Sequence, residues 1–90
     1  MLTPRLEGSE TMDYDKAKVD DAVLALMYLT LHEGAGGTRA WKGFDWDSLA
    51  RLHEKGLIGS PRGKAKSLLL TDAGVAACEA LFKQQFAVTV

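Results

Sequence analysis

Three cations at alternate positions of one short segment are the side chains of this sequence best suited to binding an anion. Arg62, Lys64 and Lys66 lie in P-R-G-K-A-K, whose proline and glycine predict a loop. Such side chains can contact the phosphates of a nucleic acid. With the segment before it, the predicted nucleic-acid-binding set is Ser48, Arg51, Lys55, Arg62, Lys64 and Lys66. We expect Ser48 to approach a base edge and the five cations to contact phosphates.

Groups suited to catalysis or metal binding are few. The one cysteine, Cys78, and the two histidines, His32 and His53, lack the paired spacing of a zinc site. Cys78 falls on an apolar stripe, so we expect a small buried hydrophobe rather than a nucleophile. We interpret Asp20 and Asp21 as a solvated pair near the start of a helix rather than a catalytic dyad. We therefore expect no enzyme, no metal and no cofactor.

The first element that must position the cations is a helix between Asp45 and Gly56. The Asp45 carboxylate can accept a hydrogen bond from an amide of the first turn. Gly56 can adopt the left-handed conformation that ends a helix. One predicted face has the three-then-four spacing of a helix and consists of Trp46, Leu49, Ala50 and His53.

Two short strands should flank the cationic loop. Leu57–Ile58 precedes it and residues 67–70 follow it, which favours an antiparallel hairpin. Thr71 then predicts the cap of a last helix, with Asp72 in its first turn. Gly74 should weaken that turn by about 1 kcal/mol relative to alanine. The buried stripe of this helix is predicted to be Val75, Cys78, Leu81, Phe82 and Phe86.

Residues 45–79 give, in order, a helix ending L-H-E-K-G-L-I, a basic turn and a strand ending L-L-L-T-D-A-G. This order resembles the second half of bacterial winged-helix regulators of the multiple-antibiotic-resistance type. The resemblance implies an α+β, winged-helix-like domain with three helices and a two- or three-stranded β-wing. The chain departs from it because only one helix fits between Gly37 and Leu57, where the regulators place two. That departure puts their major-groove reading mode in doubt.

A second resemblance covers nearly the whole chain. The segments M-Y-L-T-L-H at residues 27–32 and A-W-K-G-F-D-W at residues 40–46 look like those of a family of small, uncharacterised bacterial proteins. This likeness implies the same winged-helix-like fold and leaves the function open.

Charge is unevenly distributed along the chain. The 90 residues are enough for one domain, 47% are apolar, and the formal net charge is −1. Residues 12–33 hold two lysines and five acids, a net charge of −3, whereas residues 38–66 hold seven cations and three acids, a net charge of +4. The basic centre is compatible with phosphate contact. A solvated surface of mixed charge explains the same pattern equally well.

A long first helix is predicted, capped by Asp13 or Asp15 and running to about His32. Its second half is apolar nearly all round, which requires burial on more than one side. Either the rest of one monomer covers this surface, or a second copy does, giving a homodimer through the first and last helices. Both explanations stay open.

The segments that follow this helix are rich in glycine and then in aromatic residues. We expect residues 33–38 to be a flexible connector, because their glycines match no phosphate-loop pattern. Residues 40–42 can form a third strand. Trp41, Phe44 and Trp46 could stack on bases or grip a peptide. We favour a role in filling the core, since a domain of this size needs apolar area inside.

The two ends of the chain lack periodic patterns. We interpret residues 1–12 as a disordered leader, residues 13–86 as the folded domain and residues 87–90 as a tail. The sequence contains neither a signal peptide nor a membrane-length apolar run, so we expect a cytoplasmic protein.

The leading functional hypothesis is a binding module, dimeric, that contacts DNA through the basic centre of the chain. The alternative is a protein–protein interaction domain that keeps the winged-helix fold without binding DNA. The acids Asp45, Asp47 and Glu54 on the helix before the wing favour this alternative, because phosphate would be repelled by them.

Overall fold

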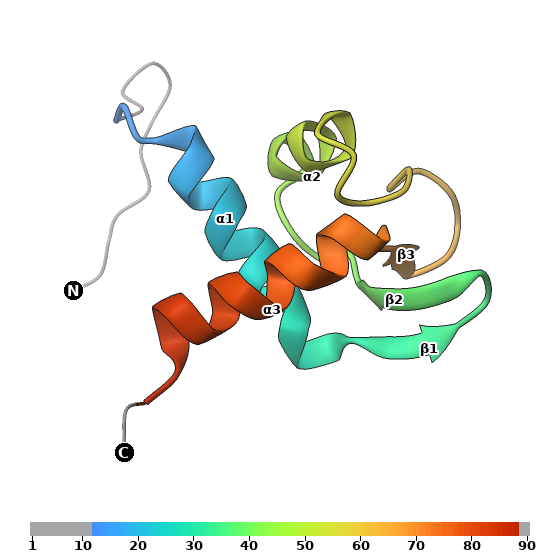
Figure 1. Cartoon of the computed structure of the whole chain (residues 1–90). Helices are drawn as coiled ribbons and strands as arrows, with labels where there is room; N and C mark the ends of the chain where they lie inside the picture. The colour runs from blue at the N-terminus through green and yellow to red at the C-terminus, as the bar shows by residue number, and fades with distance from the viewer. Residues whose placement is uncertain (1–11, 89–90) are drawn as a thin grey trace.

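The computed structural model describes residues 12–88 (Figure 1). This part of the chain is α+β, with three α-helices, one 3₁₀ helix and a three-stranded antiparallel sheet in the order β1-β2-β3. In chain order the elements are α1 (Lys16–Leu26), η1 (Met27–Thr30), β1 (His32–Gly34), β2 (Gly37–Trp41), α2 (Trp46–Glu54), β3 (Ser67–Leu69) and α3 (Asp72–Phe86). The predicted leader lies outside the described residues except for Met12, as do residues 89–90 of the predicted tail.

The predicted helix caps are confirmed. The Asp45 carboxylate accepts a hydrogen bond from the amide of Ser48 at 3.1 Å, and Gly56 has a φ of 78° just after α2. The Thr71 hydroxyl accepts from the amide of Gly74 at 2.9 Å at the start of α3. At α1 the Asp15 carboxylate accepts from the amide of Lys18 at 3.1 Å. These caps depend on local chemistry, so the sequence was enough to locate them.

The first helical segment ends near the predicted position of about His32, but its last turn is not α-helical, because the 3₁₀ helix η1 continues from α1 to Thr30. The α-helix ends at Leu26, and β1 begins at His32. Thr30 explains part of the change, because its hydroxyl donates to the carbonyl of Met27 at 3.3 Å and accepts from the amide of Trp41 at 3.0 Å. The hydroxyl thus ties the end of the helical segment to β2 instead of leaving it to extend.

The predicted flexible connector at residues 33–38 is the turn of a β-hairpin. β1 pairs with β2 from His32 opposite Arg39 to Gly34 opposite Gly37. Gly36 has a φ of 86°, and a Cβ there would lie 3.2 Å from the Leu69 side chain. Gly36 therefore permits a tight turn that packs against Leu69 of β3, and the connector is a defined turn rather than a flexible segment.

The other predicted strands are found in modified form. The expected strand at residues 40–42 is part of β2, which pairs with β3 through Ala40 opposite Leu68. The strand expected at Leu57–Ile58 is reduced to one antiparallel bridge, Ile58 with Leu70. The segment of residues 59–66 is therefore a long loop between this bridge and β3 (Figure 1).

The core lies where the three helices meet one face of the sheet. Its fully buried large side chains are Leu24, Met27, Leu49, Leu52, Ile58 and Leu68, with Cys78 beside them. Burial raises the pKa of the Cys78 thiol to about 11, so the thiol is protonated at neutral pH and serves as a small apolar side chain. Among residues 12–88, no helix has the length and apolar character needed to cross a membrane.

Candidate functional site

The three cations of the P-R-G-K-A-K segment lie together on an exposed loop. We call residues 61–66 the basic loop; Arg62, Lys64 and Lys66 are all exposed on it. Within residues 12–88 the ion pairs are Asp20–Arg51 and Glu79–Lys83, so these three cations are not neutralised by a neighbouring acid. The loop therefore presents three available positive charges to solvent.

Lys42 fixes the shape of the basic loop. Its ammonium group donates to the carbonyl of Pro61 at 2.8 Å and to the carbonyl of Gly63 at 3.0 Å. Its amide also donates to the carbonyl of Lys66 at 3.1 Å. In the sequence, Lys42 was only one charge of the basic centre. Its contacts show that it also positions the backbone that carries Arg62, Lys64 and Lys66.

Ser48 and Arg51 do not join this surface. Ser48 is completely buried, so it has no free face for a base edge. Arg51 donates from Nε to Oδ2 of Asp20 at 2.6 Å and from an Nη to Oδ1 at 2.9 Å. The interpretation of Asp20 as a solvated residue was wrong, because its carboxylate is completely buried. A signal was present: Asp20 lies three, four and seven positions before Val23, Leu24 and Met27, on the buried face of α1.

The hydrogen bonds from Arg51 determine the charge state of Asp20. They lower the pKa of the carboxyl group, while burial acts in the opposite direction and the Ser48 hydroxyl assists Arg51. The pair therefore joins α1 to α2 as an ion pair at neutral pH. Arg51 is committed to this internal contact, whereas Lys55, at the carboxyl end of α2, stays exposed.

Two tryptophans lie beside the basic loop with more than half of their surface exposed. Trp41 is 51% exposed and Trp46 is 59% exposed, so the prediction that these rings fill the core was wrong for both. Phe44 is half-buried and packs against the core as predicted. Trp41 and Trp46 border one hollow of about 500 Å³, whose other wall includes Lys64 and Lys66. Exposed aromatic area and available cations are thus side by side.

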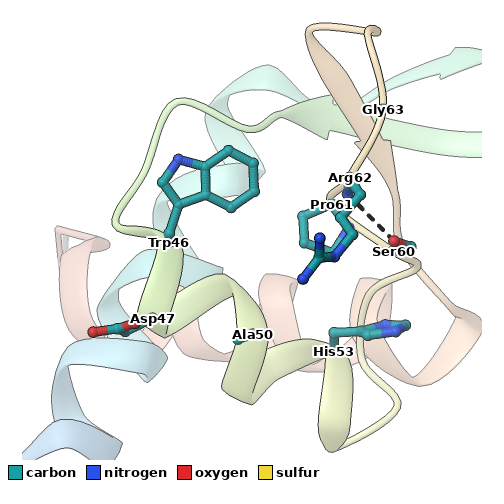
Figure 2. Close-up of a pocket in the computed structure, with 8 residues that line it drawn as sticks. All are labelled: Trp46, Asp47, Ala50, His53, Ser60, Pro61, Arg62 and Gly63. Carbon is teal, nitrogen blue, oxygen red and sulfur yellow. Dashed lines mark hydrogen bonds between the residues drawn. The ribbon is translucent and has the colours of Figure 1, made fainter.

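A second, larger cleft lies on the other side of Trp46 and encloses about 700 Å³. Figure 2 shows the Trp46 indole on one side, the Arg62 side chain reaching from the loop on the other, and Ala50 between them. The remaining lining residues are Asp47, His53, Ser60, Pro61 and Gly63. The cleft therefore combines an aromatic ring, a cation and an imidazole, while the Asp47 carboxylate points away from it (Figure 2).

His53 has a defined hydrogen-bonding role in this cleft. Its Nδ1 lies 3.1 Å from the carbonyl oxygen of Ile58. Since a carbonyl only accepts, Nδ1 must carry the proton, and Nε2 of the neutral ring is an acceptor. Within residues 12–88, no three His, Cys, Asp or Glu side chains gather in a way that could hold a metal ion.

A separate aromatic surface lies on the opposite part of the chain, where η1 meets α3. Tyr28 stacks on Phe82 with ring centroids 4.7 Å apart, and the ring centroids of Phe82 and Phe86 are 5.5 Å apart. Leu29, the residue after Tyr28, is 67% exposed, and Phe86 is 44% exposed. Apolar area is thus exposed at η1 and at the end of α3.

Comparison with known proteins assigns this chain to a family. Residues 15–88 match the family model of a domain of unknown function, DUF6429. The chain belongs to this family. The DUF6429 match spans every helix and strand of the described residues, and it includes both tryptophans and the basic loop.

One relative of similar length agrees with this assignment. The chain is 55% identical over 75 residues to the uncharacterized protein y4hR of Sinorhizobium fredii (strain NBRC 101917 / NGR234), which covers 83% of this chain and 97% of the relative. No solved structure matches the chain. These matches support the likeness to a small bacterial family, and the resemblance to winged-helix regulators stays a prediction.

Proposed function

We propose that this chain is a nucleic-acid-binding module in which the basic loop serves as the wing of a winged-helix-like domain. The observation that carries the proposal is the placement of two exposed tryptophans, Trp41 and Trp46, beside the unpaired cations Lys64 and Lys66. Cations contact phosphates, and exposed aromatic rings stack on bases. The proposal assigns binding and no catalytic chemistry.

The proposed contact surface differs from the one predicted from the sequence. Arg62, Lys64 and Lys66 remain, and the two tryptophans take the place of Ser48 and Arg51, which are buried or paired. Lys55 is exposed but lies beyond α2, away from the hollow between Trp41 and Trp46. The surface is therefore centred on the loop and the start of α2.

The exposed side of α2 is poorly suited to lie in a major groove. Asp47 and Glu54 are exposed there, and both would face phosphates or electron-rich base edges. The loop-centred surface avoids most of this repulsion, because Lys64 and Lys66 line the hollow beside Trp41, and neither Asp47 nor Glu54 lines that hollow.

A triple substitution tests the proposal. R62A/K64A/K66A should weaken binding of a labelled random oligonucleotide by at least about tenfold and flatten its salt dependence, since about one unit of slope is lost per phosphate contact. The matched control K16A/K18A/K83A removes the same charge from exposed positions of α1 and α3. Equal oligonucleotide affinities of the two variants would show that the basic loop makes no specific contribution to binding.

The aromatic surface of η1 and α3 supports a second candidate, self-association. The rings of Tyr28, Phe82 and Phe86 follow one another in contact, and Leu29, which follows Tyr28 in the chain, exposes two thirds of its area. Exposed apolar area of this kind is typical of protein contacts. Light scattering at micromolar concentration should give a dimer mass for the wild type and a monomer mass for Leu29→Glu; a monomeric wild type would contradict this candidate.

A further inference from the structure

We infer that the cleft between Trp46 and Arg62 takes one unpaired nucleobase, so that the preferred ligand is a single strand rather than a duplex. This inference rests on the proposed nucleic-acid-binding function and names its substrate class. The cleft has a volume of about 700 Å³, within the range of roughly 300–1,000 Å³ typical of small-molecule sites.

Trp46 presents an exposed aromatic ring from a fixed backbone position. It is the first residue of α2, and the adjacent Asp45 caps that helix through a 3.1 Å hydrogen bond to Ser48. Its backbone is thus held in place while 59% of the residue remains exposed. Stacking on such a ring is tolerant of sequence, because every base has a π face.

Arg62 supplies the complementary charge. Figure 2 shows its side chain reaching from the loop toward the α2 face, across the cleft from the indole. A guanidinium there can cover the second face of a stacked base or bind the adjoining phosphate. Beyond Trp46 the cations continue as Lys64 and Lys66 beside Trp41, so the backbone of a strand would pass from one aromatic ring to the other.

The polar lining of the cleft suits a base edge better than a phosphate. In the neutral ring His53 Nε2 is an acceptor, and the amino or imino groups of an unpaired base are donors. In a duplex these donors are already paired and the base faces are stacked.

The test compares single and double strands on the folded chain. Wild-type protein should bind a labelled mixed-sequence single strand more tightly than the same sequence as a duplex. Trp46→Ala should weaken single-strand binding by about tenfold and duplex binding little, while Trp46→Phe retains most of the single-strand affinity. Because Trp46 is largely exposed, circular dichroism should show the same fold for all three proteins.

A second readout places the base on this ring. The chain has two tryptophans, so Trp41→Phe leaves Trp46 as its sole indole fluorophore. Single strands should quench its fluorescence with the same midpoint as the anisotropy titration. Binding of single strands that is insensitive to Trp46→Ala, or tighter binding of duplex, would overturn the inference and leave the nucleic-acid function standing. Absence of binding to either form would overturn both.

Discussion

Asp20 of α1 and Arg51 of α2 form a two-point ion pair inside the domain, with Nε to Oδ2 at 2.6 Å and the second bond at 2.9 Å. The carboxylate is completely buried, and the Arg51 side chain is 28% exposed. The arginine thus reaches inward from the helix that carries Trp46 at its start. This contact fixes α2, and with it one wall of the cleft, relative to α1.

Asp20→Asn should destabilise the fold by about 3 kcal/mol, the lower end of the range for breaking a buried pair, because Arg51 keeps partial access to water. Chemical denaturation at neutral pH measures the loss. A matched control is Asp21→Asn on the neighbouring, partly exposed position.

The effect of Asp20→Asn should depend on pH. The pKa of Asp20 is lowered from its ordinary value of 3.8 by Arg51, so the folded state favours the ionised carboxylate. Its contribution is fully present above the unfolded pKa and is lost as the pH falls through the lower folded pKa. The difference between wild type and variant should therefore shrink in acid below about pH 4. A difference that grows on acidification would contradict the ion pair.

Gly74→Ala should destabilise the domain, although alanine is the better helix former by about 1 kcal/mol. A Cβ at position 74 would lie 1.8 Å from the carbonyl oxygen of Leu57, and the obstructing atom is backbone. We expect a loss of about 3 kcal/mol, the upper end of the range for overpacking. Gly43→Ala is the control, because nothing lies within 4 Å of its Cβ position, and it should change stability by less than about 0.5 kcal/mol.

Lys42→Met should loosen the basic loop without removing any of its three cations. The variant loses the hydrogen bonds to the carbonyls of Pro61 and Gly63. With about 1 kcal/mol lost from the closed loop, limited trypsin digestion after Arg62 should be roughly fivefold faster. Lys16→Met, on the exposed start of α1, serves as the control. Identical cleavage rates would show that other contacts hold the loop.

Cys78 should react with thiol reagents only when the protein unfolds. Its side chain is completely buried and its pKa is raised to about 11, so at pH 8 the native thiol is both inaccessible and protonated. The labelling rate should follow the unfolding rate across a denaturant series. Rapid, complete labelling of native protein would place Cys78 outside the core.

Features set by neighbouring residues were predictable from the sequence. The caps at Asp45 and Thr71 and the left-handed Gly56 follow from the chemistry of a single turn, and all three are present. The antiparallel pairing of residues 58 and 70 across the basic loop was predictable for the same reason, since a hairpin joins segments close in sequence.

Features set by distant residues were not predictable in this way. Asp20 and Arg51 are 31 positions apart, and the turn at Gly36 closes over Leu69. The exposure of Trp41 and Trp46 ran against the expectation that large aromatic rings are buried, because apolar residues are common on surfaces too. Their position beside the basic loop depends on how β2, α2 and β3 are assembled.

The most direct test of the nucleic-acid proposal is fluorescence anisotropy of a labelled random oligonucleotide, single-stranded and duplex, titrated with wild-type protein at low and moderate salt. The arrangement of Arg62, Lys64, Lys66 and the two tryptophans predicts a dissociation constant of about 1–100 μM at moderate, near-physiological salt and tighter binding at low salt. Absence of binding to both forms at low salt would contradict the proposal and leave self-association through the aromatic surface of η1 and α3 as the remaining candidate.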